Sequence, residues 1–224
     1  AAKQMADALC EQTSLGNSEC FEFVVSRNID RYVVSLGNVR FINRQFTRPV
    51  LPTNRLRLTT NKQRLFREQK IIIAGMTKRL EAALDSGGLA LGVSVYAAAE
   101  TTDDARYILG LLNSKLLSHL FRIRFKAKHL AGGFLAINKG QLAKLPIRVV
   151  DLSIPTDKQK HDRIVRLVDY IQRLHEQLLL MTTDHGRTTL QRQIDAADRE
   201  IDKIVYGLYG LTEAEIRTIE MESF

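Results

Sequence analysis

The sequence holds few cysteines and no long apolar run, and each shortage excludes a class of protein. Its 224 residues include 2 cysteines, Cys10 and Cys20, whose spacing fits neither a metal site nor a disulfide framework. No apolar run is long enough to span a membrane, and residues 1–20 lack the apolar core of a signal peptide. We therefore expect a cytoplasmic protein with no membrane partner. Because the chain begins Ala-Ala-Lys rather than with Met, we also expect it to be a fragment of a longer protein.

Acidic residues are missing from two long stretches, and this absence is the strongest signal in the sequence. Residues 31–67 contain no Asp or Glu but 9 Lys or Arg, and residues 105–150 again contain 9 basic residues and no acid. The sign then changes: residues 1–150 carry a net charge of +12 and residues 151–224 a net charge of −4. A surface built from the first part would attract a polyanion, of which nucleic acid is the commonest. A basic face that is merely solvated is the alternative.

The kind of basic residue favours specific contacts in the first stretch. Arginine outnumbers lysine there by eight to one, and Lys62 is the only lysine. A guanidinium can donate two hydrogen bonds to a phosphate or to the O6 and N7 atoms of guanine, whereas an ammonium acts as a point charge. We predict that arginines of the first stretch contact DNA phosphates and bases, and that three lysines of the second stretch form another contact surface. These residues are Arg40, Arg44, Arg48, Arg55, Arg57, Arg64, Lys126, Lys128 and Lys139.

Short runs of β-branched and aromatic residues between Gly- and Asn-rich turns predict an α+β domain with small mixed sheets. Residues 47–54 contain two prolines three apart, which predicts a loop, because proline is excluded from helix interiors and central strands. A helix is predicted to open at Thr102-Asp103-Asp104 and to continue through Leu120. Asn138 and Gln141 have the spacing of a helix-capping box. The predicted strands are 21–25, 32–36, 39–42, 71–74, 89–96, 134–137 and 145–150.

The end of the chain carries a pattern typical of two long helices. Apolar residues recur at spacings of three and four from Ile164 to Met181, and again from Leu190 to Leu208. The intervening Asp184-His185-Gly186 predicts a turn, so that the two helices fold back as an antiparallel hairpin. We therefore divide the chain into a linker or residual helix at 1–20, a basic domain at 21–150 and a helical region at 151–224.

Catalytic motifs are largely absent from the sequence. It has neither a Gly-x-Gly-x-x-Gly segment nor a phosphate-binding loop, and none of its 4 prolines are adjacent, which excludes a double-proline methyltransferase motif. Asp30, Glu68 and Lys70 follow the order in which metal-dependent nucleases present their Mg²⁺-binding Asp…Glu-x-Lys set. This pattern is common by chance, and we interpret Glu68 and Lys70 as surface or strand-edge residues, with a nuclease as the alternative. We expect no catalytic, cofactor-binding or metal-binding residue in this chain.

Several segments together resemble the target-recognition domain of Taq-type adenine-specific DNA methyltransferases. Two are fairly specific in combination: Leu-Asn-Ser-Lys at 112–115 and Ile-Val-Tyr-Gly-Leu-Tyr-Gly-Leu at 204–211. The combined restriction-and-modification (type IIG) enzymes share this domain, and the specificity subunits of type I restriction systems have a similar one, usually in duplicate. One copy is present here, which favours the type II family. The other matching segments are 28–32, 70–73, 132–133, 142–147, 194–195 and 201–216.

The resemblance implies that the chain is the C-terminal specificity half of a prokaryotic restriction-modification enzyme or adenine-N6 DNA methyltransferase. Such a half would bind double-stranded DNA and choose the site, without methylating or cutting by itself. By the same resemblance, residues 21–150 would be the DNA target-recognition domain and residues 151–224 a helical spacer or docking region. The resemblance also implies an N-terminal methyltransferase domain in the same parent protein, which would bind S-adenosylmethionine, while this chain would bind no cofactor. Besides the nuclease, a further alternative is a helical oligomerisation module whose basic face is incidental.

Overall fold

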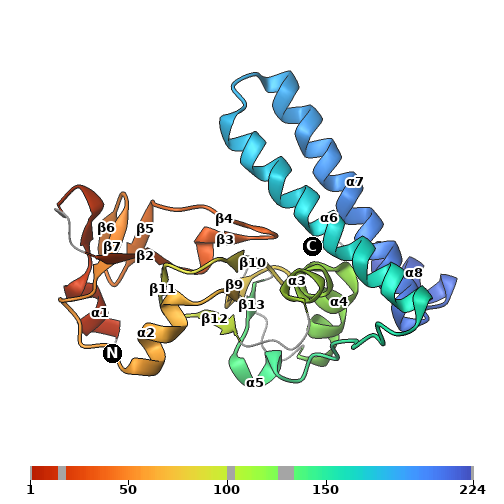
Figure 1. The fold of residues 1–224 in the computed structure, drawn as a ribbon, viewed down its shortest axis with the longest axis horizontal. Coiled ribbons are helices and arrows are strands. Elements are labelled where there is room, and N and C mark those ends of the chain that lie inside the picture. Colours follow the sequence, from red (N-terminus) through yellow and green to blue (C-terminus); the bar gives the residue numbers. More distant parts are fainter. Residues whose placement is uncertain (1, 15–18, 100–103, 126–133, 223–224) are drawn as a thin grey trace.

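The computed structural model describes residues 2–14, 19–99, 104–125 and 134–222, in which a sheet region is followed by a helical hairpin (Figure 1). The predicted α+β class and the predicted antiparallel hairpin are confirmed. None of the helices within these four segments is long and apolar enough to cross a membrane. The helices are α1 Ala2–Ala8, α2 Thr60–Arg67, α3 Ala105–Asn113, α4 Lys115–Arg124, α5 Lys139–Leu142, α6 Pro155–Leu180, α7 Asp184–Tyr209 and α8 Glu213–Glu220.

The N-terminal part is built around a four-stranded sheet with the order β1-β7-β2-β11. β11 runs parallel to β2, and the other neighbours are antiparallel. The helices α1 and α2 and the two-stranded β5–β6 ribbon pack against this sheet, and their apolar side chains form one hydrophobic core with it. The strands are β1 Cys10–Glu11, β2 Cys20–Val24, β5 Val39–Phe41, β6 Arg44–Phe46, β7 Pro49–Pro52 and β11 Leu89–Leu91.

A second sheet, β10-β8-β12, separates this core from another one. β8 is buried along its whole length, and its side chains alternate: Ile71 and Ile73 belong to a core shared with the helices, whereas Ile72 and Ala74 belong to the core of the first sheet. β8 is therefore a wall common to both cores. The strands are β8 Lys70–Ala74, β10 Ala82–Asp85 and β12 Val95–Ala98, and two small pairs are β3 Ile29–Asp30 with β4 Val33–Val34 and β9 Met76–Thr77 with β13 Leu135–Ala136.

The antiparallel helices α6 and α7 project away from the sheet region, with α3 and α4 at their base (Figure 1). Their apolar stripes face each other and the α3–α4 pair, so that the hairpin shares the second core with β8 and β10. α3 approaches α6 closely at Gly110, where a Cβ atom would lie 2.5 Å from Cγ2 of Ile164. The hairpin is thus anchored on the sheet region through α3.

Two helix boundaries differ from the prediction because a hydroxyl side chain caps a helix there. Thr183 accepts a hydrogen bond from a backbone N–H in the first turn of α7, so the helix already begins at Asp184 and the turn lies before the predicted position. Ser114 ends α3 and begins α4, and its hydroxyl accepts a hydrogen bond from Leu117 N (3.3 Å). The helix predicted to run through Leu120 is therefore broken into two.

β7 lies between two other strands although it contains Pro49 and Pro52, so the predicted loop at 47–54 is wrong. The two prolines occupy the ends of the strand: Pro49 pairs only with β1, and Pro52 only with β2. Val50, between them, is the residue that pairs with both neighbours. The prolines are tolerated because the N–H that each lacks falls where β7 has a single neighbour.

The remaining predicted elements are confirmed in part. Residues 89–96 contain two strands rather than one, because β11 and β12 belong to different sheets and a turn separates them. Residues 145–150 form no strand; the hydroxyls of Tyr107 and Tyr209 donate to carbonyl groups of this segment in place of a ladder. α3 begins after Asp104, whose side chain caps it, and the two residues predicted before this cap lie outside the described segments.

Candidate nucleic-acid interface

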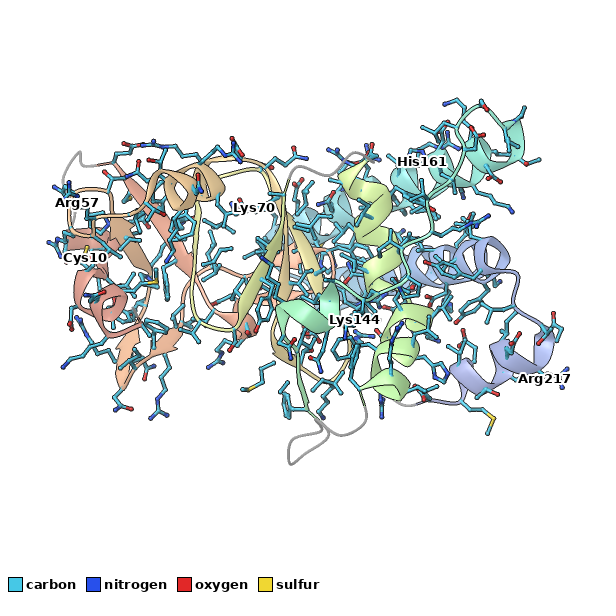
Figure 2. All side chains as sticks on the ribbon, turned by 90° about the horizontal axis from the view of Figure 1, so that it is seen from below. Cys10, Arg57, Lys70, Lys144, His161 and Arg217 are labelled. Carbon is cyan, nitrogen blue, oxygen red and sulfur yellow. The ribbon has the colours of Figure 1, made fainter. Side chains whose placement is uncertain are left out.

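The arginines predicted to contact DNA all have exposed side chains on the sheet region. Figure 2 shows Arg57 at one end of the molecule and Arg217 of α8 at the other, so Arg57 lies far from α8. The arginines are spread over the β5–β6 ribbon, the segments flanking β7 and α2. They are Arg40, Arg44, Arg48, Arg55, Arg57 and Arg64.

Half of this set is held by other groups of the protein. Arg48 donates to a carboxylate of β2 (2.7 Å), and Arg64 lies 3.7 Å from a carboxylate one helical turn further along the chain. Arg44 donates to the backbone carbonyl of Ala6 (2.7 Å) and lies over the ring of Phe46. The arginines of the set whose side chains meet no hydrogen-bond or ion-pair partner within the described segments are Arg40, Arg55 and Arg57.

Two cations of the second acid-free stretch, in contrast, are paired with carboxylates of the C-terminal helices. Arg106 of α3 forms an ion pair with Asp169 of α6 (2.5 Å). Lys115 of α4 forms another with Glu220 of α8. The opposite net charges of the two parts of the chain therefore reflect, to this extent, pairing inside the protein rather than a surface for a polyanion.

Lys139 is exposed in the first turn of α5, whose cap Asn138 forms the predicted capping box with Gln141. Lys139 and Lys62 of α2 lie on the rim of one open hollow of about 570 Å³ with mainly apolar walls. The hollow thus brings one lysine of each acid-free stretch to the same place. The other lysines predicted for this surface lie outside the described residues: Lys126 and Lys128.

Arg31, although it belongs to the first acid-free stretch, faces the protein interior at a joint between the sheet region and the hairpin. Its guanidinium donates to both carboxylate oxygens of Asp198 on α7 and to the backbone carbonyl of Asn113 (2.7 Å). The hydroxyl of Tyr32 donates to the same carboxylate (2.9 Å). Two of the segments that resemble target-recognition domains, 28–32 and 112–115, therefore meet here, and their shared role is to join two parts of the fold.

Asp202, one turn further along α7, also lies in this joint. Its Oδ1 accepts a hydrogen bond from Lys115 N (2.9 Å), whereas its buried Oδ2 has no partner within the part of the chain that the structure describes. Burial, followed by the nearby carboxylate of Asp198, raises the pKa of Asp202 to about 7. The joint therefore contains a group that changes its charge near neutral pH.

The residues of the nuclease alternative, Asp30, Glu68 and Lys70, are not brought together. Lys70, expected at the surface or at a strand edge, is buried, because its ammonium pairs with the buried Asp85 on the neighbouring strand β10. The side chain of Glu68 is exposed and faces Arg64. β3, which carries Asp30, adjoins the opposite end of β8, about 10 Å away at about 3.3 Å per residue. Among the described residues, no three His, Cys, Asp or Glu side chains form a group that could hold a metal ion.

Comparisons with known proteins agree with the fold and the resemblance. The model of the TaqI-like C-terminal specificity domain matches residues 22–147. Over 162 residues the chain is 24% identical to the type II restriction enzyme and methyltransferase RM.Eco57I of Escherichia coli, and the match covers 68% of this chain and 16% of that protein. The type IIL restriction-modification enzyme MmeI, solved in complex with DNA, has a similar fold, with a TM-score of 0.56 and 12% identity over 93% of this chain and 32% of that one. The chain thus spans less than a third of either protein.

Proposed function

The chain belongs to the family of TaqI-like C-terminal specificity domains, and we propose that it selects the DNA sequence on which a restriction-modification enzyme acts. The observation that carries this proposal is the set of exposed, unpaired arginines on the sheet region. Exposed guanidinium groups without a carboxylate partner remain available for phosphates and base edges. Within the described residues they are Arg40, Arg55 and Arg57.

The parent protein is proposed to be an enzyme with a separate methyltransferase domain on the N-terminal side. The name of RM.Eco57I as both restriction enzyme and methyltransferase supports an enzymatic parent. This sequence has neither a Gly-x-Gly-x-x-Gly segment nor adjacent prolines, so the other domain would hold S-adenosylmethionine and would methylate adenine at N6. In this proposal residues 21–150 recognise DNA without catalysing a reaction, and residues 151–224 separate them from the catalytic domain.

Charge reversal of the unpaired arginines tests the proposed DNA contact. The triple variant Arg40→Glu, Arg55→Glu, Arg57→Glu is expected to bind duplex DNA on the order of 1,000-fold more weakly at about 0.1 M salt, because each of the three contacts contributes close to one decade under these conditions. Its affinity should also depend less on salt, with a slope of log K against log [salt] smaller by about two or more. Titration of labelled duplex DNA across a salt series measures both quantities.

A matched control reverses the same number of charges on the hairpin, where no DNA contact is proposed. Its substitutions fall on exposed arginines of α6 and α7, and it should bind DNA within about threefold of the unmodified chain. If the triple variant of the sheet region binds DNA within twofold of the unmodified chain, the assignment of these arginines is wrong. The control substitutions are Arg173→Glu, Arg192→Glu and Arg199→Glu.

A further inference from the structure

The β5–β6 ribbon turns one face to the protein core and the other to solvent. Val39, Phe41 and Phe46 are buried on the inner face. Arg40 and Gln45 are directly opposite each other across the two strands, on the outer face, and both are exposed. Arginine is the commonest partner of guanine in the major groove, and glutamine can donate to adenine N7 and accept from adenine N6. The outer face therefore presents two base-reading side chains next to each other.

The tip of the ribbon carries an exposed apolar residue in an unfavourable backbone conformation. Ile42 and Asn43 connect the strands with φ angles of 42° and 59°, in the left-handed region that two-residue hairpin turns require. Asparagine tolerates this region, whereas a β-branched residue in it costs on the order of 1–3 kcal/mol. The side chain of Ile42 is nevertheless 44% exposed, so contacts within the protein do not account for the choice of residue. A thymine methyl group is an apolar partner that DNA offers in the major groove.

The ribbon is held rigidly enough to present these side chains in a fixed orientation. On the inner face, the ring centroids of Phe41 and of Phe23 in β2 lie 4.9 Å apart, in an edge-to-face arrangement. Arg44 lies over the Phe46 ring and donates to the backbone carbonyl of Ala6 in α1. Side chains fixed before binding lose less conformational entropy when they contact a ligand.

The dimensions of the ribbon also match those of the DNA major groove. Its strands of three residues are about 10 Å long, close to the depth of about 8.5 Å of the major groove, whose width of about 12 Å admits a two-stranded ribbon. We propose that the β5–β6 ribbon enters the major groove, where Gln45 and Arg40 read base edges and Ile42 contacts a thymine methyl group. Arg55 and Arg57 then bind phosphates. This inference rests on the proposed function and deepens it by separating base-reading from phosphate-binding residues.

Gln45→Ala gives the most direct test because it removes no charge. The unmodified chain and the variant each select duplexes from a random-sequence pool, and sequencing gives the preference at every position of the enriched motif. The variant should lose about tenfold of its discrimination at one base pair, while its affinity for non-specific DNA and its salt dependence stay unchanged. Arg40→Ala should relax a nearby position, again without a change in salt dependence. Arg48→Ala, whose guanidinium is held by Glu22, is the matched control and should keep every preference.

Ile42→Asn separates base reading from folding, because asparagine relieves the backbone strain. The variant should unfold at the same or a higher temperature than the unmodified chain, and should nevertheless lose preference at one position of the motif. A structural role for Ile42 predicts the reverse: a lower unfolding temperature with unchanged preferences.

The outcomes distinguish this inference from the proposed function. If Gln45→Ala and Arg40→Ala both keep the preferences of the unmodified chain, the ribbon is not the reader, whereas the chain's own enrichment of a motif upholds the proposed function. If Arg40→Ala lowers the salt slope by about one and changes no preference, Arg40 binds a phosphate and its assigned role is overturned. If the unmodified chain enriches no motif, the proposed function and this inference both fail.

Discussion

The two acid-free stretches have the same count of basic residues, and each contains both paired and unpaired cations, but the unpaired arginines belong to the first. In residues 31–67 several guanidinium groups point into solvent from a ribbon and from loops, with no carboxylate of the described segments within reach. In residues 105–150, Arg106 and Lys115 lie on helices packed against the hairpin region, which supplies the carboxylates that pair with them. We therefore expect a run of basic residues to form a ligand surface only where the fold leaves the charges unpaired. Substitutions at free and at paired cations should therefore have different effects on stability and on DNA binding.

The largest effect is expected when a cation that the protein holds is deprived of its partner. Asp198→Ala leaves the guanidinium of Arg31 buried beside a carbonyl and a hydroxyl, and the free energy of unfolding should fall by about 3–5 kcal/mol. Urea denaturation measures this change. Glu200→Ala is the control, since it removes a carboxylate of the same helix from the exposed pair with Arg163 and should cost less than about 1 kcal/mol. Equal losses in the two variants would contradict a special role for the joint.

The joint should also make stability depend on pH, through Asp202. Its pKa is about 7 in the folded protein and 3.8 as its ordinary value, so between these values the folded chain binds a proton that the unfolded chain has released. Stability should therefore be greatest at the acidic end of this window and fall as pH rises, by up to about 1.4 kcal/mol per pH unit. Urea denaturation at pH 5 and pH 7 measures the loss. Asp202→Asn should flatten the dependence, whereas Asp195→Asn, at an exposed position of α7, should leave it intact.

Removing equal charge from each stretch compares them directly. Arg55→Ala with Arg57→Ala should weaken binding to duplex DNA by about tenfold per residue at about 0.1 M salt, because both groups are free. Arg106→Ala with Lys115→Ala should leave the affinity within about twofold, because carboxylates of the hairpin region already neutralise both groups. Fluorescence anisotropy of a labelled duplex measures both. A similar loss in the two double variants would show that ion pairing does not decide which cations reach DNA.

The smallest effect is expected at an exposed arginine that is only partly held. The pair between Arg48 and Glu22 is more than half exposed on the arginine side, so Arg48→Ala should change the free energy of unfolding by less than about 1 kcal/mol. The same variant should change DNA affinity by less than about threefold. Glu22→Gln sharpens the test: it releases the Arg48 guanidinium and should strengthen DNA binding slightly, as anisotropy titration at low salt would show.

Local patterns in the sequence predicted the elements whose causes are local. The spacing of apolar residues from Ile164 onward predicted both hairpin helices, and the side chains of Asn138 and Gln141 predicted the start of α5. The same approach failed at Pro49 and Pro52, because which end of a strand has one neighbour depends on the sheet order. The order of the strands cannot be inferred from the two prolines alone.

The pairings that decide which cations are free join distant residues, so the sequence could not predict them. Arg31 and Asp198 are 167 positions apart, and a count of charges placed Arg31 with the basic stretch expected to face DNA. Lys70 precedes a buried apolar run and has its partner Asp85 on the next strand of the sheet, so that burial was missed as well. Gln45 is uncharged, and its position opposite Arg40 follows only from the register of the ribbon.

The alternation along β8 has a consequence for how such proteins diversify. Ile72 and Ala74 face the arginine-bearing half, while Ile71 and Ile73 face the helical half. β8 is therefore a partition between two separate hydrophobic cores. Substitutions that reshape the ribbon can be accommodated by repacking on one side of this partition. The attachment of the hairpin on the other side is left undisturbed. Under the proposed function, new DNA preferences could therefore arise by substitutions on one side of β8, without rebuilding the side that anchors the hairpin.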